Sequence, residues 1–178
     1  NGPNMKNPWG YMVLLRAAYY DLFPQHNKIL SLDVDTIVLK DISPLWDIDI
    51  SNYYFAGVRE PEKSKGGRQY RSPLYVNFGV TMYNLAKLRD GTGAKAIAAL
   101  NNTRYMFSEQ DYFNLTCHEK IKEIDSSYND THYFNSFNIT TPTADPKILH
   151  YAAIRDYYNY PEFKKYQEMK ISAGKGKY

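Results

Sequence analysis

The apolar residues of this chain form two kinds of segment: stretches of helical length, and shorter runs with the length of strands. Residues 9–23 are mostly apolar and lie between Pro8 and Pro24, which predicts a helix. Further helices are predicted at residues 85–89 and 94–101 and from near Glu109. Strands are predicted at residues 28–32, 36–39, 53–58, 76–84, 120–125 and 146–152.

The order of these segments indicates the fold class. Strands alternate with helices, which is typical of an α/β fold with a largely parallel sheet flanked by helices. Arg16 is the lone charge in the middle of the first helix, and Ser43 with Pro44 predicts the N-cap and first residue of a short helical turn. Residues 59–73 are charged and too long for a plain turn, which indicates either a mobile lid over a site or a disordered segment.

The composition is that of one globular domain. The chain has 178 residues, of which 43% are hydrophobic and 23% charged. A net charge of +3 without a basic stripe leads us to expect no nucleic-acid partner. The single cysteine, Cys117, excludes an internal disulfide and a thiolate zinc cluster. A basic C-terminal end would fit either peripheral contact with an anionic membrane or a solvated helix face and frayed tail; it contains Lys164, Lys165, Lys170, Lys175 and Lys177.

Two acids directly follow the strand predicted at 28–32. Asp33 and Asp35 are two residues apart, and side chains i and i+2 of a strand point the same way. They could converge on one cation outside the carboxyl end of the strand, where open α/β sheets bind ligands. Their oxygens suit Mg²⁺ or Mn²⁺, which in turn bind substrate phosphates. The same tripeptide also occurs in surface loops, so the residues alone leave both interpretations open.

Two other segments carry groups that could join such a site. His150 lies at the end of the last predicted strand, where an imidazole would complete a carboxylate site suited to Mn²⁺. A histidine after an apolar run is also a common core residue. Glu109, Gln110 and Asp111 begin a predicted helix, where they either pair with the helix dipole or line a polar pocket. Their spacing does not decide between the two.

In order, these segments resemble the retaining glycosyltransferases of family 8, the galactosyl- and glucosyltransferase group with a GT-A fold. LDVDTIV matches the metal-binding D-x-D strand, and VNFGVTMYNL matches the F-N-[SA]-G-V segment. EQDYFN matches the D-Q-D-x-x-N helix, and ILHYA matches the histidine-containing C-terminal strand. The resemblance covers residues 16–155 and implies a GT-A (Rossmann-like) α/β fold with a mixed, mainly parallel sheet flanked by helices.

The resemblance also implies an activity. A family 8 enzyme of this group would move a hexose from a UDP-sugar donor to a saccharide, glycolipid or glycoprotein acceptor, as in polysaccharide biosynthesis, and would depend on Mn²⁺ or Mg²⁺. The implied metal ligands are Asp33, Asp35 and His150. The implied donor-binding residues are Arg16, Asp33, Val34, Asp35, Asn77, Ala153 and Arg155. The implied catalytic residues are Gln110, beneath the anomeric carbon, and Glu109, which with Asn77 holds sugar hydroxyls. Whether Gln110 is a weak nucleophile or a supporting dipole stays open.

Three positions depart from the family pattern. Phe78 stands where a small residue is usual and is expected to narrow the sugar pocket. Glu109 replaces an aspartate and is one methylene longer, which bears on donor preference. Ala153 and Asp156 stand at the glycine and lysine of H-x-x-G-x-x-K, so Arg155 is expected to supply the missing diphosphate contact.

The chain starts just before the arginine-bearing helix. We therefore expect a single GT-A domain over residues 1–178 that lacks the first βα units of the nucleotide-binding half. The expected location is a bacterial cytoplasm, with peripheral membrane contact through the basic end. A Golgi lumen is the alternative, because four N-x-[ST] sequons begin at Asn101, Asn114, Asn129 and Asn138.

Two other functions stay open from the sequence. One is a degenerate member of the same fold that only binds a sugar or a partner. The other is a haloacid-dehalogenase-like phosphohydrolase, in which a D-x-D also ends a strand and its first aspartate is the nucleophile. That pattern requires threonine or valine four residues after the first aspartate, where Ile37 stands.

Overall fold

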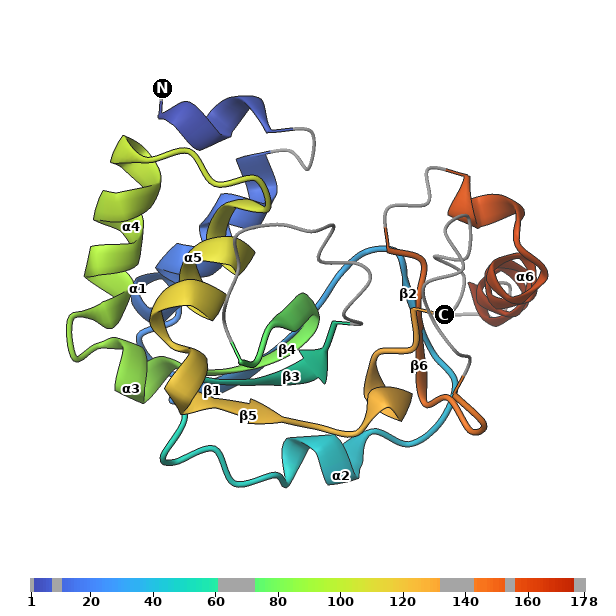
Figure 1. Ribbon diagram of the computed structural model, residues 1–178. Helices are drawn as coiled ribbons and strands as arrows, with labels where there is room; N and C mark the ends of the chain where they lie inside the picture. Colours follow the sequence, from blue (N-terminus) through green and yellow to red (C-terminus); the bar gives the residue numbers. More distant parts are fainter. Residues whose placement is uncertain (1, 8–10, 61–72, 132–142, 153–155, 175–178) are drawn as a thin grey trace.

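The computed structural model describes residues 2–7, 11–60, 73–131, 143–152 and 156–174. Its main sheet has four strands in the order β1–β4–β3–β5 (Figure 1). β4 is antiparallel to both β1 and β3, whereas β3 is parallel to β5. It follows that β1, β3 and β5 run in one direction and end at the same edge of the sheet. The bounds are β1 Lys28–Leu32, β4 Val76–Asn84, β3 Phe55–Arg59 and β5 Ile121–Glu123.

This mixed sheet with flanking helices is the α/β class that the sequence predicts. The alternation of strands and helices correctly indicated a common direction for β1, β3 and β5. It did not indicate that β4 runs against them, which makes antiparallel pairing the more frequent kind in the described residues. Among the described strands, β3 and β4 are consecutive and pair directly in antiparallel register, whereas a parallel pair requires a crossover connection.

Helices cover both faces of the sheet (Figure 1). Most lie on one face, and α2 (Ser43–Trp46) lies on the other. Successive strand residues face opposite sides, so Phe55 is buried in the core under the helices while Ala56 is buried in the core on the side of α2. The helices of the larger layer are α1 (Tyr19–Leu22), α3 (Leu85–Leu88), α4 (Thr92–Asn102), α5 (Ser108–Thr116) and the 3₁₀ helix η2 (Tyr11–Ala18).

The ladder between β3 and β4 is interrupted near the end of β3. Pairing moves from Gly57–Thr81 to Arg59–Val76, so β3 advances by two residues while β4 advances by five. The extra residues of β4 bulge out of the ladder, and bulges of this kind re-aim side chains and occur often beside active sites. Asn77 lies in this bulge.

A second, two-stranded sheet joins β2 (Thr36–Val38) to β6 (Ile148–His150) in antiparallel register. It packs against aromatic residues that precede and begin the C-terminal helix α6 (Pro161–Gly174). The register places His150 opposite Thr36, one residue after the D-x-D segment. Short 3₁₀ helices complete the described elements: η1 (Pro3–Lys6), η4 (His118–Lys120), η5 (Ser126–Tyr128) and η7 (Tyr157–Asn159).

Two local predictions need correction or lie outside the description. Ser43 is the first residue of α2 rather than its N-cap, and its side chain makes no capping bond. Instead, Asp41 accepts hydrogen bonds from the backbone N–H and the hydroxyl of Ser43. The segment predicted as a lid, 59–73, falls mostly on residues outside the description. Among the described helices, none has the length and apolar character required to cross a bilayer.

Candidate active site

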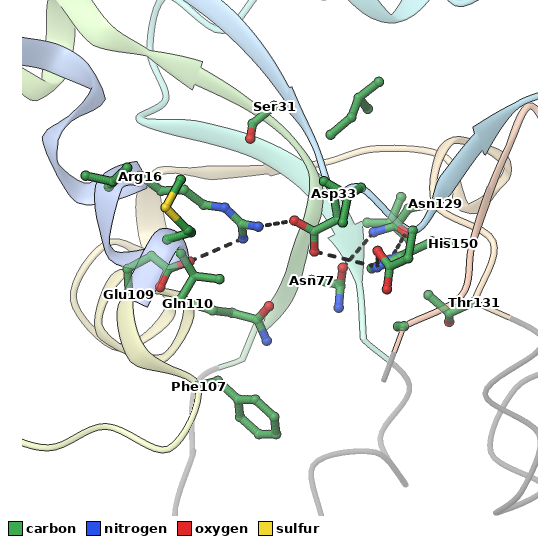
Figure 2. Close-up of a pocket in the computed structure, with 18 of the residues that line it drawn as sticks. Arg16, Ser31, Asp33, Asn77, Phe107, Glu109, Gln110, Asn129, Thr131 and His150 are labelled. Carbon is green, nitrogen blue, oxygen red and sulfur yellow. Dashed lines mark hydrogen bonds and ion pairs between the residues drawn. The ribbon is translucent and has the colours of Figure 1, made fainter. Parts of the chain in front are cut away.

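A cavity of about 650 Å³ opens at the edge where β1 and β3 end. Asp33 follows β1 and Glu60 follows β3, and both line this cavity. Because the two strands run in the same direction, their polar end residues meet at one edge. Figure 2 shows that Arg16 and Glu109 reach the same space from helices, and that His150 reaches it from the second sheet.

Two carboxylates and an imidazole lie together in the cavity. His150 Nε2 lies 3.4 Å from Asp35 Oδ1 and 3.7 Å from Asp33 Oδ2. One ligand atom of each residue lies within 4.8 Å of the other two. The backbone N–H of Asp33 donates to Gly79 O at 2.7 Å, and Asp35 O accepts from the N–H of Tyr151 at 2.9 Å, which fixes both aspartates. Two carboxylate oxygens and one imidazole nitrogen form a donor set suited to Mn²⁺.

The absence of a side chain at position 79 makes room for the histidine. A Cβ at Gly79 would lie 2.0 Å from Cε1, 2.6 Å from Nδ1 and 2.7 Å from Nε2 of His150. The imidazole is 2% exposed and so has little space to move away. Glycine at this position therefore allows His150 to reach the aspartates.

Arg16 links the aspartate cluster to α5, the helix that carries Glu109 and Gln110. Its guanidinium forms an ion pair with Asp33 Oδ1 and a second with Glu109 Oε1, the latter at 3.2 Å (Figure 2). It also donates to Phe78 O at 3.3 Å. The two oxygens of Asp33 are thus divided: one is held by Arg16, and the other points toward His150 and stays available to a cation.

Glu109 is an acid buried at the wall of the cavity. Its residue exposure is 1%, and its Oε2 has no hydrogen-bond partner among the described residues. Burial raises the pKa of Glu109 to about 8, although the charge of Arg16 opposes the shift. A buried polar atom without a partner costs free energy. The arrangement is therefore suited to a hydroxyl group of a ligand that enters the cavity.

Gln110 and Asn77 meet at the carboxylate of Glu60. Gln110 Nε2 donates to Glu60 Oε1 at 3.1 Å, and Asn77 Nδ2 donates to the same oxygen at 2.9 Å. The other end of Gln110, its Oε1, accepts the backbone N–H of Phe78 at 2.9 Å. Tyr75 also accepts from Gln110 Nε2, at 3.0 Å, so both ends of this amide are held in place.

The comparisons with known proteins bear directly on this site. The model of glycosyl transferase family 8 matches residues 1–155. The chain belongs to glycosyl transferase family 8. Family membership gives no support to the phosphohydrolase alternative.

Individual family members agree with this assignment. A Haemophilus influenzae protein described as a glycosyltransferase is 31% identical over 113 residues, which are 58% of this chain and 34% of that protein. Glycosyltransferase GlyA of Streptococcus pneumoniae is 28% identical over 156 residues, 84% of this chain and 22% of its own length. The chain thus spans about a third or less of these two relatives.

A solved structure of galactosyltransferase LgtC, in complex with donor and acceptor sugar analogs, shares the fold. It superposes with a TM-score of 0.63 at 19% identity, over 88% of this chain and 66% of that one. The α/β sheet described above is thus the GT-A-like fold of family 8.

The structure brings most of the sequence-predicted site residues of this family 8 member to one cavity. The lining includes Arg16, Asp33, Val34, Asp35, Asn77, Glu109, Gln110 and His150. Ala153 and Arg155, predicted as donor-binding residues, lie outside the described residues.

The prediction that Phe78 narrows the sugar pocket needs correction. Its side chain is fully buried in the core, against Phe55, Tyr83 and Phe113. Only its backbone serves the site, through the bonds to Arg16 and Gln110. The reason is the alternation of side chains along the strand, which turns residue 78 into the core next to Asn77.

Three residues of the site were not found from the sequence. Glu60 directly follows β3, as Asp33 directly follows β1, so the expectation that ligands bind beyond the carboxyl ends of strands could have indicated Glu60. Tyr75 donates to Asp111 Oδ1 at 2.5 Å and thereby supports the start of α5. Asn129 lies at the cavity and bonds to the ring of His150 at 2.8 Å, yet its sequence context gave only a sequon.

Proposed function

We propose that this chain carries the metal site and the catalytic residues of a retaining hexosyltransferase that uses a UDP-sugar and Mn²⁺ or Mg²⁺. The observation that carries the proposal is the cluster of Asp33, Asp35 and His150 beside the buried oxygen of Glu109 in one cavity. The solved complex of LgtC with donor and acceptor sugar analogs supports the substrate class.

In the proposed complex, one group of residues would act on the diphosphate of the donor and another would bind its sugar. Asp33, Asp35 and His150 would hold a divalent cation, which when bound would supply charge stabilisation for the leaving diphosphate. Glu109 would form a hydrogen bond with a sugar hydroxyl, because Glu109 lines the cavity and its Oε2 has no hydrogen-bond partner among the described residues. Arg16 pairs with both Asp33 and Glu109 and so holds the proposed metal ligand and the proposed sugar-binding residue at a fixed separation.

In the proposed reaction the bond from C1 of the sugar to the diphosphate oxygen breaks with its electron pair on the diphosphate. The acceptor oxygen forms the new bond to C1 on the same face, and its proton passes to a phosphate oxygen of the leaving group. The fixed amide of Gln110 favours the role of a dipole, because its Oε1 already accepts the N–H of Phe78. A dipole of this kind stabilises the oxocarbenium-like transition state.

The test is release of UDP from UDP-hexoses by the purified protein, with Mn²⁺ and with excess chelator. We expect metal-dependent release that Asp35→Ala abolishes. Asp47→Ala is the matched control, because Asp47 is an exposed carboxylate at the end of α2, on the opposite face of the sheet. A protein that binds Mn²⁺ and UDP but releases no UDP from any common UDP-hexose is the degenerate sugar-binding alternative, and this result would overturn the proposal.

The acceptor class, the peripheral membrane contact and the bacterial location stay predictions. Of the basic C-terminal residues, Lys175 and Lys177 lie outside the described part of the chain. A vesicle co-sedimentation assay with anionic and neutral lipids tests the membrane contact directly.

A further inference from the structure

A chain of side-chain hydrogen bonds runs from the bulge of β4 to the ring of His150. Asn77 Oδ1 accepts the backbone N–H of Gly79 at 2.8 Å and Nδ2 of Asn129 at 3.0 Å. Asn129 Oδ1 in turn lies 2.8 Å from His150 Nδ1 (Figure 2). Asn129 is 3% exposed and His150 is 2% exposed, so the hydrogen bond between them is shielded from water, whereas Asn77 is half-buried.

The donor and the acceptor of each hydrogen bond in this series follow from the orientation of the Asn77 amide. A backbone N–H can only donate, so the atom of Asn77 that faces Gly79 must be its oxygen. At the other end of the same amide, a carboxylate oxygen of Glu60 accepts from Asn77, which requires the nitrogen there. Both ends of the Asn77 amide therefore agree on one orientation.

The orientation then passes to the next amide. Because Asn77 presents an oxygen, the atom of Asn129 that meets it must be the NH₂ group. The atom that Asn129 presents to the histidine is consequently its carbonyl oxygen, which can only accept. His150 must carry a proton on Nδ1 in order to make this hydrogen bond.

We infer that Asn129 is a positioning residue that fixes the tautomer of His150, with the proton on Nδ1 and a free lone pair on Nε2. In a neutral ring with this tautomer, the lone pair faces Asp35 Oδ1 at 3.4 Å and Asp33 Oδ2 at 3.7 Å. A lone pair opposite two carboxylates is unfavourable unless a cation, or a second proton on the ring, lies between them. The inference rests on the proposed function, since it assigns to Asn129 the task of keeping His150 ready for the divalent cation.

The alternative tautomer shows why a positioning residue is needed. If the proton of His150 moved to Nε2, it could bond directly to the aspartates, and the site would be closed by an internal hydrogen bond. Loss of the acceptor at Asn129 removes the interaction that opposes this change. Groups that orient a ligating histidine through its other nitrogen typically contribute about 10- to 100-fold to metal affinity.

The experiment compares two substitutions at one position. Asn129→Leu has a similar volume but offers no acceptor, whereas Asn129→Asp keeps an acceptor for the ring. Asn102→Leu is the control, because Asn102 is an exposed residue of α4 whose side chain bonds only to Ala98 O within its own helix. The protonated nitrogen of His150 is identified by ¹⁵N NMR of histidine-labelled, metal-free protein at mildly alkaline pH, where a free imidazole is neutral. The His150→Gln spectrum assigns the signal, and Mn²⁺ affinity is measured by isothermal titration calorimetry.

We expect the proton on Nδ1 in the unsubstituted protein, in Asn129→Asp and in the control. In Asn129→Leu we expect it on Nε2, together with a loss of Mn²⁺ affinity of about 10- to 100-fold. A proton on Nε2 in the unsubstituted protein would overturn the inference even if Asn129→Leu failed to fold. An Asn129→Leu protein with unchanged tautomer and unchanged affinity would overturn it as well. Absence of Mn²⁺ binding in the unsubstituted protein would instead overturn the metal part of the proposed function, while the NMR comparison would still decide the tautomer.

Discussion

Gly79 gives a direct test of the metal site, because one added methyl group collides with a single ring. In Gly79→Ala the new Cβ would lie 2.0 Å from His150 Cε1, whereas ordinary contact begins at 3.4 Å. The imidazole must therefore move by about 1.4 Å, the difference between these two distances. Metal–ligand distances tolerate deviations of only about 0.2 Å, so the displaced ring can no longer serve as a ligand.

The expected effects follow from this displacement. Overpacking of a closed core site costs about 1–3 kcal/mol, which lowers the melting temperature of a chain of this size by about 2–12 °C. Mn²⁺ affinity should fall by at least about 10-fold, as it does when groups that orient a ligating histidine are lost. Differential scanning calorimetry measures the first effect, and titration calorimetry with Mn²⁺ measures the second.

The control is a glycine whose substitution costs stability for another reason. Gly91 has φ of +103° and no atom within 4 Å of an added Cβ, so Gly91→Ala strains the backbone far from the site by about 1–2 kcal/mol. Gly79 does not have a positive φ, and its substitution acts through the contact alone. We expect both variants to be less stable and only Gly79→Ala to lose Mn²⁺. Mn²⁺ affinity in Gly79→Ala equal to that of the unsubstituted protein would refute the argument.

Two further predictions concern the sugar end of the cavity. Burial raises the pKa of Glu109 to about 8, so between the ordinary pKa of a glutamate and pH 8 the folded chain keeps a proton that the unfolded chain releases. The free energy of unfolding should therefore fall as pH rises across this window, by at most about 1.4 kcal/mol per pH unit. Denaturant unfolding at several pH values checks this, and a slope in Glu109→Gln equal to that of the unsubstituted protein would contradict it. Gln110→Ala should lower turnover by about 100-fold or more while Mn²⁺ affinity stays unchanged, because its amide bonds to Phe78 N and not to the aspartates; a parallel loss of metal binding would show that Gln110 acts on the metal end instead.

The strands and most helices could be predicted because their signals are local. The apolar run before Asp33 forms β1, and the segment that starts near Glu109 forms α5. The first helix was placed correctly but forms mainly as the 3₁₀ helix η2 followed by one α-helical turn. The antiparallel course of β4 was not predicted, because strand propensity carries no information about the partner strand or its direction.

The candidate site could be predicted in part, and the residues predicted correctly to lie together belong to the family motifs. Asp33, Asp35 and His150 lie together as the resemblance to family 8 implied. The prediction for Phe78 failed because the family pattern names the residue type but not the side of the strand on which it lies in this chain. Asn129 was missed because nothing in its neighbourhood along the chain indicates that it would meet a histidine 21 residues further on.

The sequence by itself determined which polar groups are available and where each stands on its element: two acids after a buried strand, an arginine within an apolar helix, and an acid–amide pair at a helix start. These facts depend on local periodicity and residue type. The tertiary structure alone decided that β1 and β3 end at one edge of the sheet and that Gly79 leaves room for His150. It also decided that the NH₂ group of Asn129 donates to the carbonyl oxygen of Asn77. Such contacts join residues far apart in the chain. They are set by packing and by the requirement that each buried donor meets an acceptor, which only the folded molecule can satisfy.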